Sequence, residues 1–233
     1  MPSTEPDGRR PLKSRDFPVF IGLATWLADH NATPNAISFL SIVFGGFAGL
    51  ALAATAHVTG WAWHACWLFA ALAIQLRLVA NLLDGMVAVE GGRGGPTGDL
   101  WNEAPDRVAD AAVFIGAGYA AGSHPALGFA AALVAVFVAY VRALGASLGA
   151  GQIFIGPQAK QQRMAVMTAT CVLLTIYPAR LIDAVPPGFF IMLALAVVIV
   201  GGLVTAVRRL KTVAEFLRRK EVSPRTKEVE TAP

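Results

Sequence analysis

The stretch NLLDGMVAVEGGRGGPTGDLWNEAPDRVAD, residues 81–110, is the polar interruption in a chain otherwise made of long apolar runs. Asn81 and Asp84 precede its glycine-rich middle, and Asn102, Asp106 and Asp110 follow it at intervals of four residues. Residues three or four apart share one face of a helix. We therefore expect two helix ends to turn oxygen ligands toward each other across a short connection.

The composition around this stretch is that of a membrane protein. Of the 233 residues, 55% are hydrophobic and 15% are charged, against about 25% charged in soluble domains. Apolar runs long enough to cross a bilayer as a helix recur along the chain. No basic stripe is interleaved with aromatic residues, so nucleic-acid binding is not expected. The expected fold class is an all-α integral membrane protein.

Six spanning helices are expected, preceded by an amphipathic helix at 16–31 that lies in the membrane interface. A tilted, partial first span is the alternative for 16–31. Thr33 and Pro34 are the residue types of a helix N-cap and first helical position. The six spans fall roughly at 35–56, 62–89, 100–121, 126–149, 163–179 and 188–207.

The spans form a single domain at 16–210, between a disordered segment at 1–15 and a charged, mobile tail at 211–233, where a short helix at 210–220 is possible. Lys and Arg gather in both terminal segments, which predicts that both termini are cytoplasmic. The same assignment places the 81–110 stretch at the cytoplasmic side, together with Arg142, Lys160 and Arg163.

Acids inside membrane spans cost about 2.5–3.5 kcal/mol each, so they usually face the bundle interior and need a partner. Asp84, Asp106 and Asp110 would repel one another there, and a divalent cation resolves the conflict. Carboxylate and amide oxygens are ligands that Mg²⁺ or Mn²⁺ accepts. A cation at the membrane–cytosol boundary suggests that the site holds a pyrophosphate and supports phosphoryl chemistry.

The order of these residues resembles the signature of the CDP-alcohol phosphotransferase family, Asp-x2-Asp-Gly-x2-Ala-Arg-x8-Gly-x3-Asp-x3-Asp. Laid on the chain without a gap from residue 81, the signature is matched at five positions: Asp84, Gly85, Ala88, Gly98 and Asp106. It is not matched at three: asparagine replaces aspartate at Asn81 and Asn102, and valine replaces arginine at Val89. Asparagine keeps a carbonyl oxygen but loses the negative charge.

The resemblance implies an enzyme that moves a phosphatidyl group from a CDP-alcohol, with CDP-diacylglycerol as the expected donor, to a small alcohol acceptor, with CMP release, in phospholipid synthesis. Asp106 would be the base, and the ligands of Mg²⁺ or Mn²⁺ would be Asn81, Asp84, Asn102 and Asp106. The nucleotide would lie against Gly85, Ala88 and Gly98, with Arg77 or Arg93 replacing the missing arginine. The acceptor would be held by Arg142, Lys160 and Arg163. Glu90, Glu103 and Asp110 are candidates to supply the missing negative charge.

Other interpretations remain open from the sequence. The lost acids also suit a non-catalytic homologue that binds lipid or nucleotide. An ion-coupled transporter is a third possibility, although its acids would be expected nearer the membrane midplane. Arg77 could instead pair with Asp84, and Gly45, Gly46 and Gly49 could permit close helix packing. A homodimer, surrounded by membrane lipids, is the expected assembly.

Overall fold

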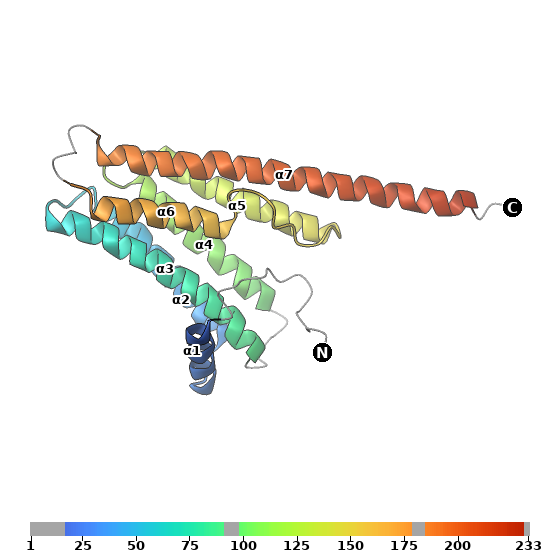
Figure 1. Cartoon of the computed structure of the whole chain (residues 1–233), viewed down its shortest axis with the longest axis horizontal. Helices are drawn as coiled ribbons and strands as arrows, with labels where there is room; N and C mark the ends of the chain where they lie inside the picture. Colours follow the sequence, from blue (N-terminus) through green and yellow to red (C-terminus); the bar gives the residue numbers. More distant parts are fainter. Residues whose placement is uncertain (1–16, 91–97, 179–184, 231–233) are drawn as a thin grey trace.

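The computed structural model describes residues 17–90, 98–178 and 185–230, and every regular element in these ranges is a helix (Figure 1). The helices are α1 (Pro18–Asp29), α2 (Pro34–Ala54), α3 (Trp61–Glu90), α4 (Gly98–Gly118), α5 (Pro125–Ser147), α6 (Lys160–Thr175) and α7 (Pro187–Glu230). The expected disordered segment 1–15 and the glycine-rich turn at 91–97 lie outside the described residues. So do the side chains of Val89, Glu90, Asp99, Asn102 and residues 221–230.

Two of the helices begin at the caps that the sequence provides. The Thr33 side chain accepts a hydrogen bond from the backbone N–H of Ala36 at 3.2 Å, with Pro34 at the first position of α2. At the start of α5, the ring of His124 accepts from the N–H of Ala126 at 3.2 Å. These bonds satisfy N–H groups that a helix start leaves without a backbone partner. The predicted start of the first span is therefore confirmed.

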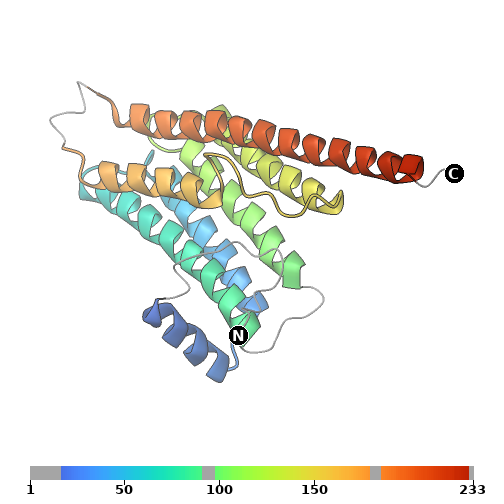
Figure 2. The same ribbon diagram turned by 45° about the vertical axis from the view of Figure 1, so that its right-hand side comes forward.

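Helices α2 to α7 lie side by side as a bundle, and α1 packs against α3 at one end of it (Figures 1 and 2). Helix α4 contacts both α2 and α5. It approaches α2 so closely that a Cβ atom on Gly49 would lie 2.4 Å from the carbonyl oxygen of Ala112. A Cβ atom on Gly45 would lie 2.7 Å from that of Ala109, whereas Gly46 has nothing within 4 Å. The expected close packing is confirmed for Gly45 and Gly49 only.

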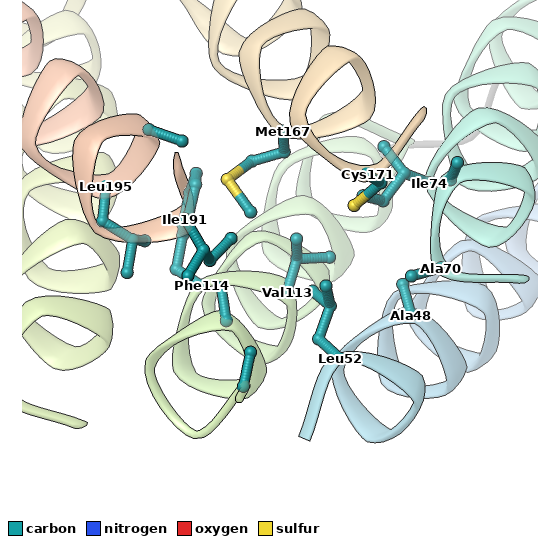
Figure 3. Packing of buried hydrophobic residues seen from close by; sticks show 14 of the residues in the cluster. Ala48, Leu52, Ala70, Ile74, Val113, Phe114, Met167, Cys171, Ile191 and Leu195 are labelled. Atoms are coloured by element: carbon teal, nitrogen blue, oxygen red, sulfur yellow. The ribbon is translucent and has the colours of Figure 1, made fainter. Parts of the chain in front are cut away.

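An apolar core joins six of the helices, α2 to α7, beneath the polar end of the bundle. Figure 3 shows side chains of α2, α3, α4, α6 and α7 meeting there, among them Leu52, Ile74, Phe114, Met167 and Ile191. All five are fully buried. Each Å² of apolar surface that is buried stabilises the fold by about 25 cal/mol. The core therefore holds α4 and α6 in the positions from which their polar ends face α3.

Four helices in the described ranges are long and apolar enough to cross a membrane: α2, α3, α5 and the part of α7 that spans Pro187–Lys220. Large apolar side chains cover their outer faces, as at Leu50, Leu133 and Val200, which are 69%, 71% and 62% exposed. Water-soluble proteins rarely expose apolar patches of this extent, so the outer surface suits lipid. Helices α4 and α6 complete the bundle. They are not both long and apolar enough to count as spans, because α4 carries the acids and α6 has only 16 residues.

The C-terminal segment differs from the prediction. Instead of a mobile tail with a short helix, α7 continues without interruption to Glu230 and extends beyond the other helices of the bundle (Figure 1). Residues 203–220 contain no glycine or proline, so nothing in this segment breaks the helix. Arg209 also fixes it in place, because its Nε donates to the Ile155 carbonyl at 3.0 Å and its Nη1 to the Val138 carbonyl at 3.1 Å.

Candidate functional site

The polar residues of the 81–110 stretch meet at one end of the bundle, where α3 ends and α2, α4 and α6 begin. Asp84 lies six residues before the end of α3, and Asp106 lies in the first half of α4. Both side chains are almost fully buried, at 3% and 5% exposure. The two helix ends expected from the spacing therefore do meet, and the start of α6 adds basic side chains to them.

Asp84 is held on one side only. Its Oδ2 accepts a hydrogen bond from the hydroxyl of Ser38 on α2 at 2.7 Å. Its Oδ1 is buried and has no hydrogen-bond partner among the described residues. A buried carboxylate oxygen without a partner costs about 1–3 kcal/mol or more, so this atom marks a place where a cation or a donor group would stabilise the protein.

Asp106 is surrounded by donors. Its Oδ1 accepts from the Asn81 amide nitrogen and lies 3.3 Å from Nη2 of Arg77. Its Oδ2 accepts from the Lys160 ammonium and lies 3.5 Å from Nη2 of Arg107. Both oxygens of Asp106 are thus engaged by nitrogen donors. Three of these donors carry positive charge, and they come from α3, α4 and α6.

Asp110 lies deeper and forms a buried cluster with two arginines. Its Oδ1 lies 2.6 Å from Nη2 of Arg77, and its Oδ2 lies 2.9 Å from Nη2 of Arg163. The three side chains are 1% exposed or less. Arg163 also donates to the Gln158 carbonyl at 3.1 Å. Asp110, Arg77 and Arg163 therefore join α3, α4 and α6 below the site, and Arg77 pairs with Asp106 and Asp110 rather than with Asp84.

Glu103 and Arg142 form a more exposed pair at the edge of the site. Glu103 Oε1 accepts from Arg142, and its Oε2 lies 3.2 Å from Nη2 of Arg107. The Glu103 side chain is 44% exposed and that of Arg142 is 19% exposed. Glu103 is thus already paired with two arginines. Of the three basic residues expected to hold an acceptor, Lys160 and Arg142 reach the surface, whereas Arg163 is buried.

The glycine and alanine positions of the motif line the same region. Gly85 and Ala88 are half-buried on α3, and a Cβ atom on Gly98, the first residue of α4, would meet nothing within 4 Å. The side chain of Asn102 lies outside the described part of α4. The expected roles of these residues in nucleotide and cation binding stay predictions.

One described carboxylate of the site has room for a cation. No three His, Cys, Asp or Glu side chains in the described ranges gather as a metal site. Asp84, however, offers a buried oxygen without a partner, and Mg²⁺ is commonly held by one or two carboxylates together with water and the phosphates of a substrate. One cation beside Asp84 is compatible with this arrangement.

Three contributors to the site were missed from the sequence. Ser38 stands in an apolar span, and a polar residue one turn after a helix start is the only local signal for it. Arg107 directly follows Asp106, and Gln158 lies in a loop between spans. Their roles depend on how helices far apart in the sequence are packed, which no local spacing reveals.

Three solved structures share this arrangement of helices. All are of phosphatidylinositol phosphate synthase (PgsA1) from Mycobacterium tuberculosis. The chain has the fold of this synthase. The complex with manganese and citrate matches with a TM-score of 0.67 and 18% identity, over 83% of this chain and 88% of that one. The form with CDP-DAG bound matches with a TM-score of 0.65 and 20% identity, over 84% of this chain and 93% of that one. The apo form matches with a TM-score of 0.64 and 18% identity, over 82% of this chain and 94% of that one.

No family model matches the sequence, and no curated protein matches it significantly. At identities of 18–20%, the likeness to PgsA1 establishes the fold. The resemblance expected from the motif is confirmed at that level, since PgsA1 is a CDP-alcohol phosphotransferase. The sequence departs from the motif at Asn81, Val89 and Asn102, within the segment by which such a likeness would be recognised.

Proposed function

We propose that the protein transfers a phosphatidyl group from a CDP-linked lipid, with CDP-diacylglycerol as the donor, to a small alcohol and releases CMP. The observation that carries the proposal is the meeting of Asp84, Asp106 and Lys160 at one end of the bundle. The fold supports it, because one PgsA1 structure of the same fold has CDP-DAG bound. The product would enter phospholipid synthesis.

In this reaction the oxygen of the acceptor hydroxyl attacks the lipid-side phosphorus, and the bond from that phosphorus to the oxygen of CMP breaks. Asp106 takes the hydroxyl proton. Lys160 contacts Asp106 Oδ2, and a phosphate bound nearby competes for its ammonium, which opens that oxygen to the acceptor. Arg77 contacts Asp106 from the buried side and holds the carboxylate in place.

Asp84 would hold Mg²⁺ or Mn²⁺, with Asn81 and Asn102 as neighbouring oxygen ligands and Asp106 beside them. Such a cation, when bound, stabilises negative charge on the transferring phosphate. Gly85, Ala88 and Gly98 leave room for the nucleotide beside it. On the acceptor side, Arg142 and Lys160 are the basic groups with exposed surface, so they would contact a phosphorylated acceptor.

The proposal also includes the placement in the membrane. All six bundle helices would cross it, with α1 in the interface and both termini in the cytoplasm. The excess of Lys and Arg in the terminal segments supports this orientation. The site would then open to the cytosol, where a water-soluble acceptor is available. A homodimer is the proposed assembly.

The test is CMP release by the purified full-length protein in lipid nanodiscs, with CDP-diacylglycerol, Mg²⁺ or Mn²⁺, and a panel of acceptors. Glycerol 3-phosphate, inositol phosphate and serine belong to the panel. We expect CMP release with at least one acceptor, its loss in Asp106→Asn, and its retention in Asp29→Asn, which alters an exposed aspartate on α1. No release with any acceptor would refute the proposal.

A non-catalytic protein that binds a CDP-linked lipid is the second candidate. It is favoured by the donors around Asp106, which leave neither of its oxygens without a contact. The two candidates differ in the behaviour of Asp106→Ala. A binding protein retains affinity for CDP-diacylglycerol and releases no CMP with or without the substitution, whereas in an enzyme the substitution abolishes CMP release.

A further inference from the structure

The described carboxylates of the site differ in their charged partners, and Asp110 is paired with two arginines. Asp110 is fully buried, with one oxygen 2.6 Å from Arg77 and the other 2.9 Å from Arg163. A divalent ion could reach it only by separating a buried ion pair, which costs about 3–5 kcal/mol when one partner is lost. Glu103 is likewise paired, with Arg142 and Arg107. Asp84 and Asp106 are the two remaining described acids of the site.

Asp106 already has a resident cation. The ammonium of Lys160 contacts Oδ2, while Asn81 and Arg77 donate to Oδ1. An ionised carboxylate has about four lone-pair sites, and these contacts occupy both of its oxygens. A metal ion on Asp106 would have to displace the ammonium and then remain beside it, against the repulsion of like charges.

Asp84, unlike Asp106, has an oxygen that is free to bind a cation. Its Oδ2 is bound by Ser38 at 2.7 Å, and its buried Oδ1 has no partner in the described part of the chain. No arginine or lysine lies within ion-pair distance of Asp84 in the described ranges, and the charge of Lys160 acts on it only from farther away. A cation on this oxygen would satisfy it without displacing a group of the protein.

The residue types at 81 and 102 further limit the negative charge that is available to metal ions. Both are asparagines, which supply a carbonyl oxygen but no negative charge. Asp84 is then the one aspartate of the site, among the described residues, that has no ion pair, and one carboxylate with two amides suits one divalent cation rather than two. A second divalent cation would add positive charge to a site that already contains Lys160 and Arg77.

We propose that Lys160 acts as a built-in monovalent cation at Asp106, so that the site binds one divalent ion, at Asp84, and excludes a second. The inference rests on the cation of the proposed function and goes beyond it, because it assigns the number of ions and the residue that limits that number. Lys160 is suited to the role, since it begins α6 and its ammonium reaches across to α4.

The test is the stoichiometry of Mn²⁺ binding to the full-length protein in nanodiscs containing CDP-diacylglycerol, followed by electron paramagnetic resonance of free Mn²⁺. We expect one Mn²⁺ per chain. The double variant Asn81→Asp with Asn102→Asp restores two acids. When Lys160→Met is added to this double variant, the affinity for a second Mn²⁺ should rise by at least about tenfold over that of the double variant, because the competing ammonium is gone. When Lys211→Met, at an exposed position of α7, is added instead, the affinity for a second Mn²⁺ should equal that of the double variant.

Two bound ions in the unmodified protein, or none, would overturn the inference. The inference would also be overturned if the double variant bound a second Mn²⁺ equally well with and without Lys160→Met, at equal thermal stability. CMP release, measured in the same samples, separates the two proposals. Two ions with CMP release refute the single-ion site and leave the transferase intact, whereas one ion without CMP release refutes the transferase and leaves the single-ion site intact.

Discussion

The ammonium of Lys160, at the first residue of α6, contacts the carboxylate of Asp106 on α4, although 54 positions separate the two residues in the sequence. The contact brings a basic side chain from a distant helix to the last aspartate of the motif. It gives that aspartate a counter-charge from within the chain.

Removing Arg77 should destabilise the protein strongly. Arg77 is fully buried between Asp106 and Asp110, so Arg77→Met leaves buried negative charge with fewer partners. We expect a loss of about 3–5 kcal/mol in the free energy of unfolding, measured by denaturant titration in detergent micelles. Arg107→Met is the control, because Arg107 is partly exposed and its surface pairs contribute about 1 kcal/mol or less. Equal losses in both variants would contradict the buried role of Arg77.

The crossing of α2 and α4 should not tolerate a methyl group at Gly49. A Cβ atom there would lie 2.4 Å from the Ala112 carbonyl oxygen, which is backbone and cannot rotate away. We expect Gly49→Ala to cost about 1–3 kcal/mol through overpacking and to lower the thermal midpoint. Gly46→Ala, on the same helix with open space around it, should be neutral or slightly stabilising. A neutral Gly49→Ala would show that the helices lie farther apart.

Ser38 should influence cation binding at Asp84. Its hydroxyl donates to Oδ2 at 2.7 Å and fixes the direction of the carboxylate. Loss of such a supporting hydrogen bond typically weakens metal binding about 10–100-fold, so Ser38→Ala should raise the Kd for Mn²⁺ by at least about tenfold. Ser41→Ala is the matched control, because the Ser41 hydroxyl is buried on α2 without a hydrogen-bond partner in the described part of the chain. Identical Mn²⁺ affinities in the two variants would exclude a cation at Asp84.

Arg142 should affect the acceptor more than the fold. It pairs with the half-exposed Glu103 at the edge of the site, so Arg142→Met should change the free energy of unfolding by about 1 kcal/mol or less. If the acceptor carries a phosphate, the same substitution should raise its KM several-fold with little change in kcat, because only binding is weakened. A fall in kcat at unchanged KM would argue against contact with the acceptor.

Much of this architecture could be predicted from local sequence. Long apolar runs located α2, α3, α5 and the first part of α7, and Thr33 with Pro34 marked the start of α2. Four-residue spacing placed Asp106 and Asp110 on one face of α4, and the motif related Asp106 to Asp84. These features depend on neighbouring residues, so the sequence carries them directly.

The pairing of charges could not be predicted in the same way. Arg163 looked available to a ligand because it begins a span, but it is buried against Asp110. Arg209 lies among the basic residues near the end of the chain, yet it donates to two backbone carbonyls inside the bundle. In both cases the partner belongs to a distant helix or loop, and only the packing of the bundle selects it. The length of α7 was missed because charged residues at 208–220 indicated a solvated tail, although the same residues are good helix formers.

The role of Asp106 as the base that takes the acceptor's proton is tested most directly by CMP release from CDP-diacylglycerol. The release is measured for the full-length protein and for Asp106→Asn, with CDP-diacylglycerol binding followed in parallel. The account predicts CMP release by the unmodified protein and a loss of at least about 100-fold in kcat in the variant, in the range of general-base catalysis, while the lipid still binds. Equal CMP release by both proteins, or none by either, would contradict it.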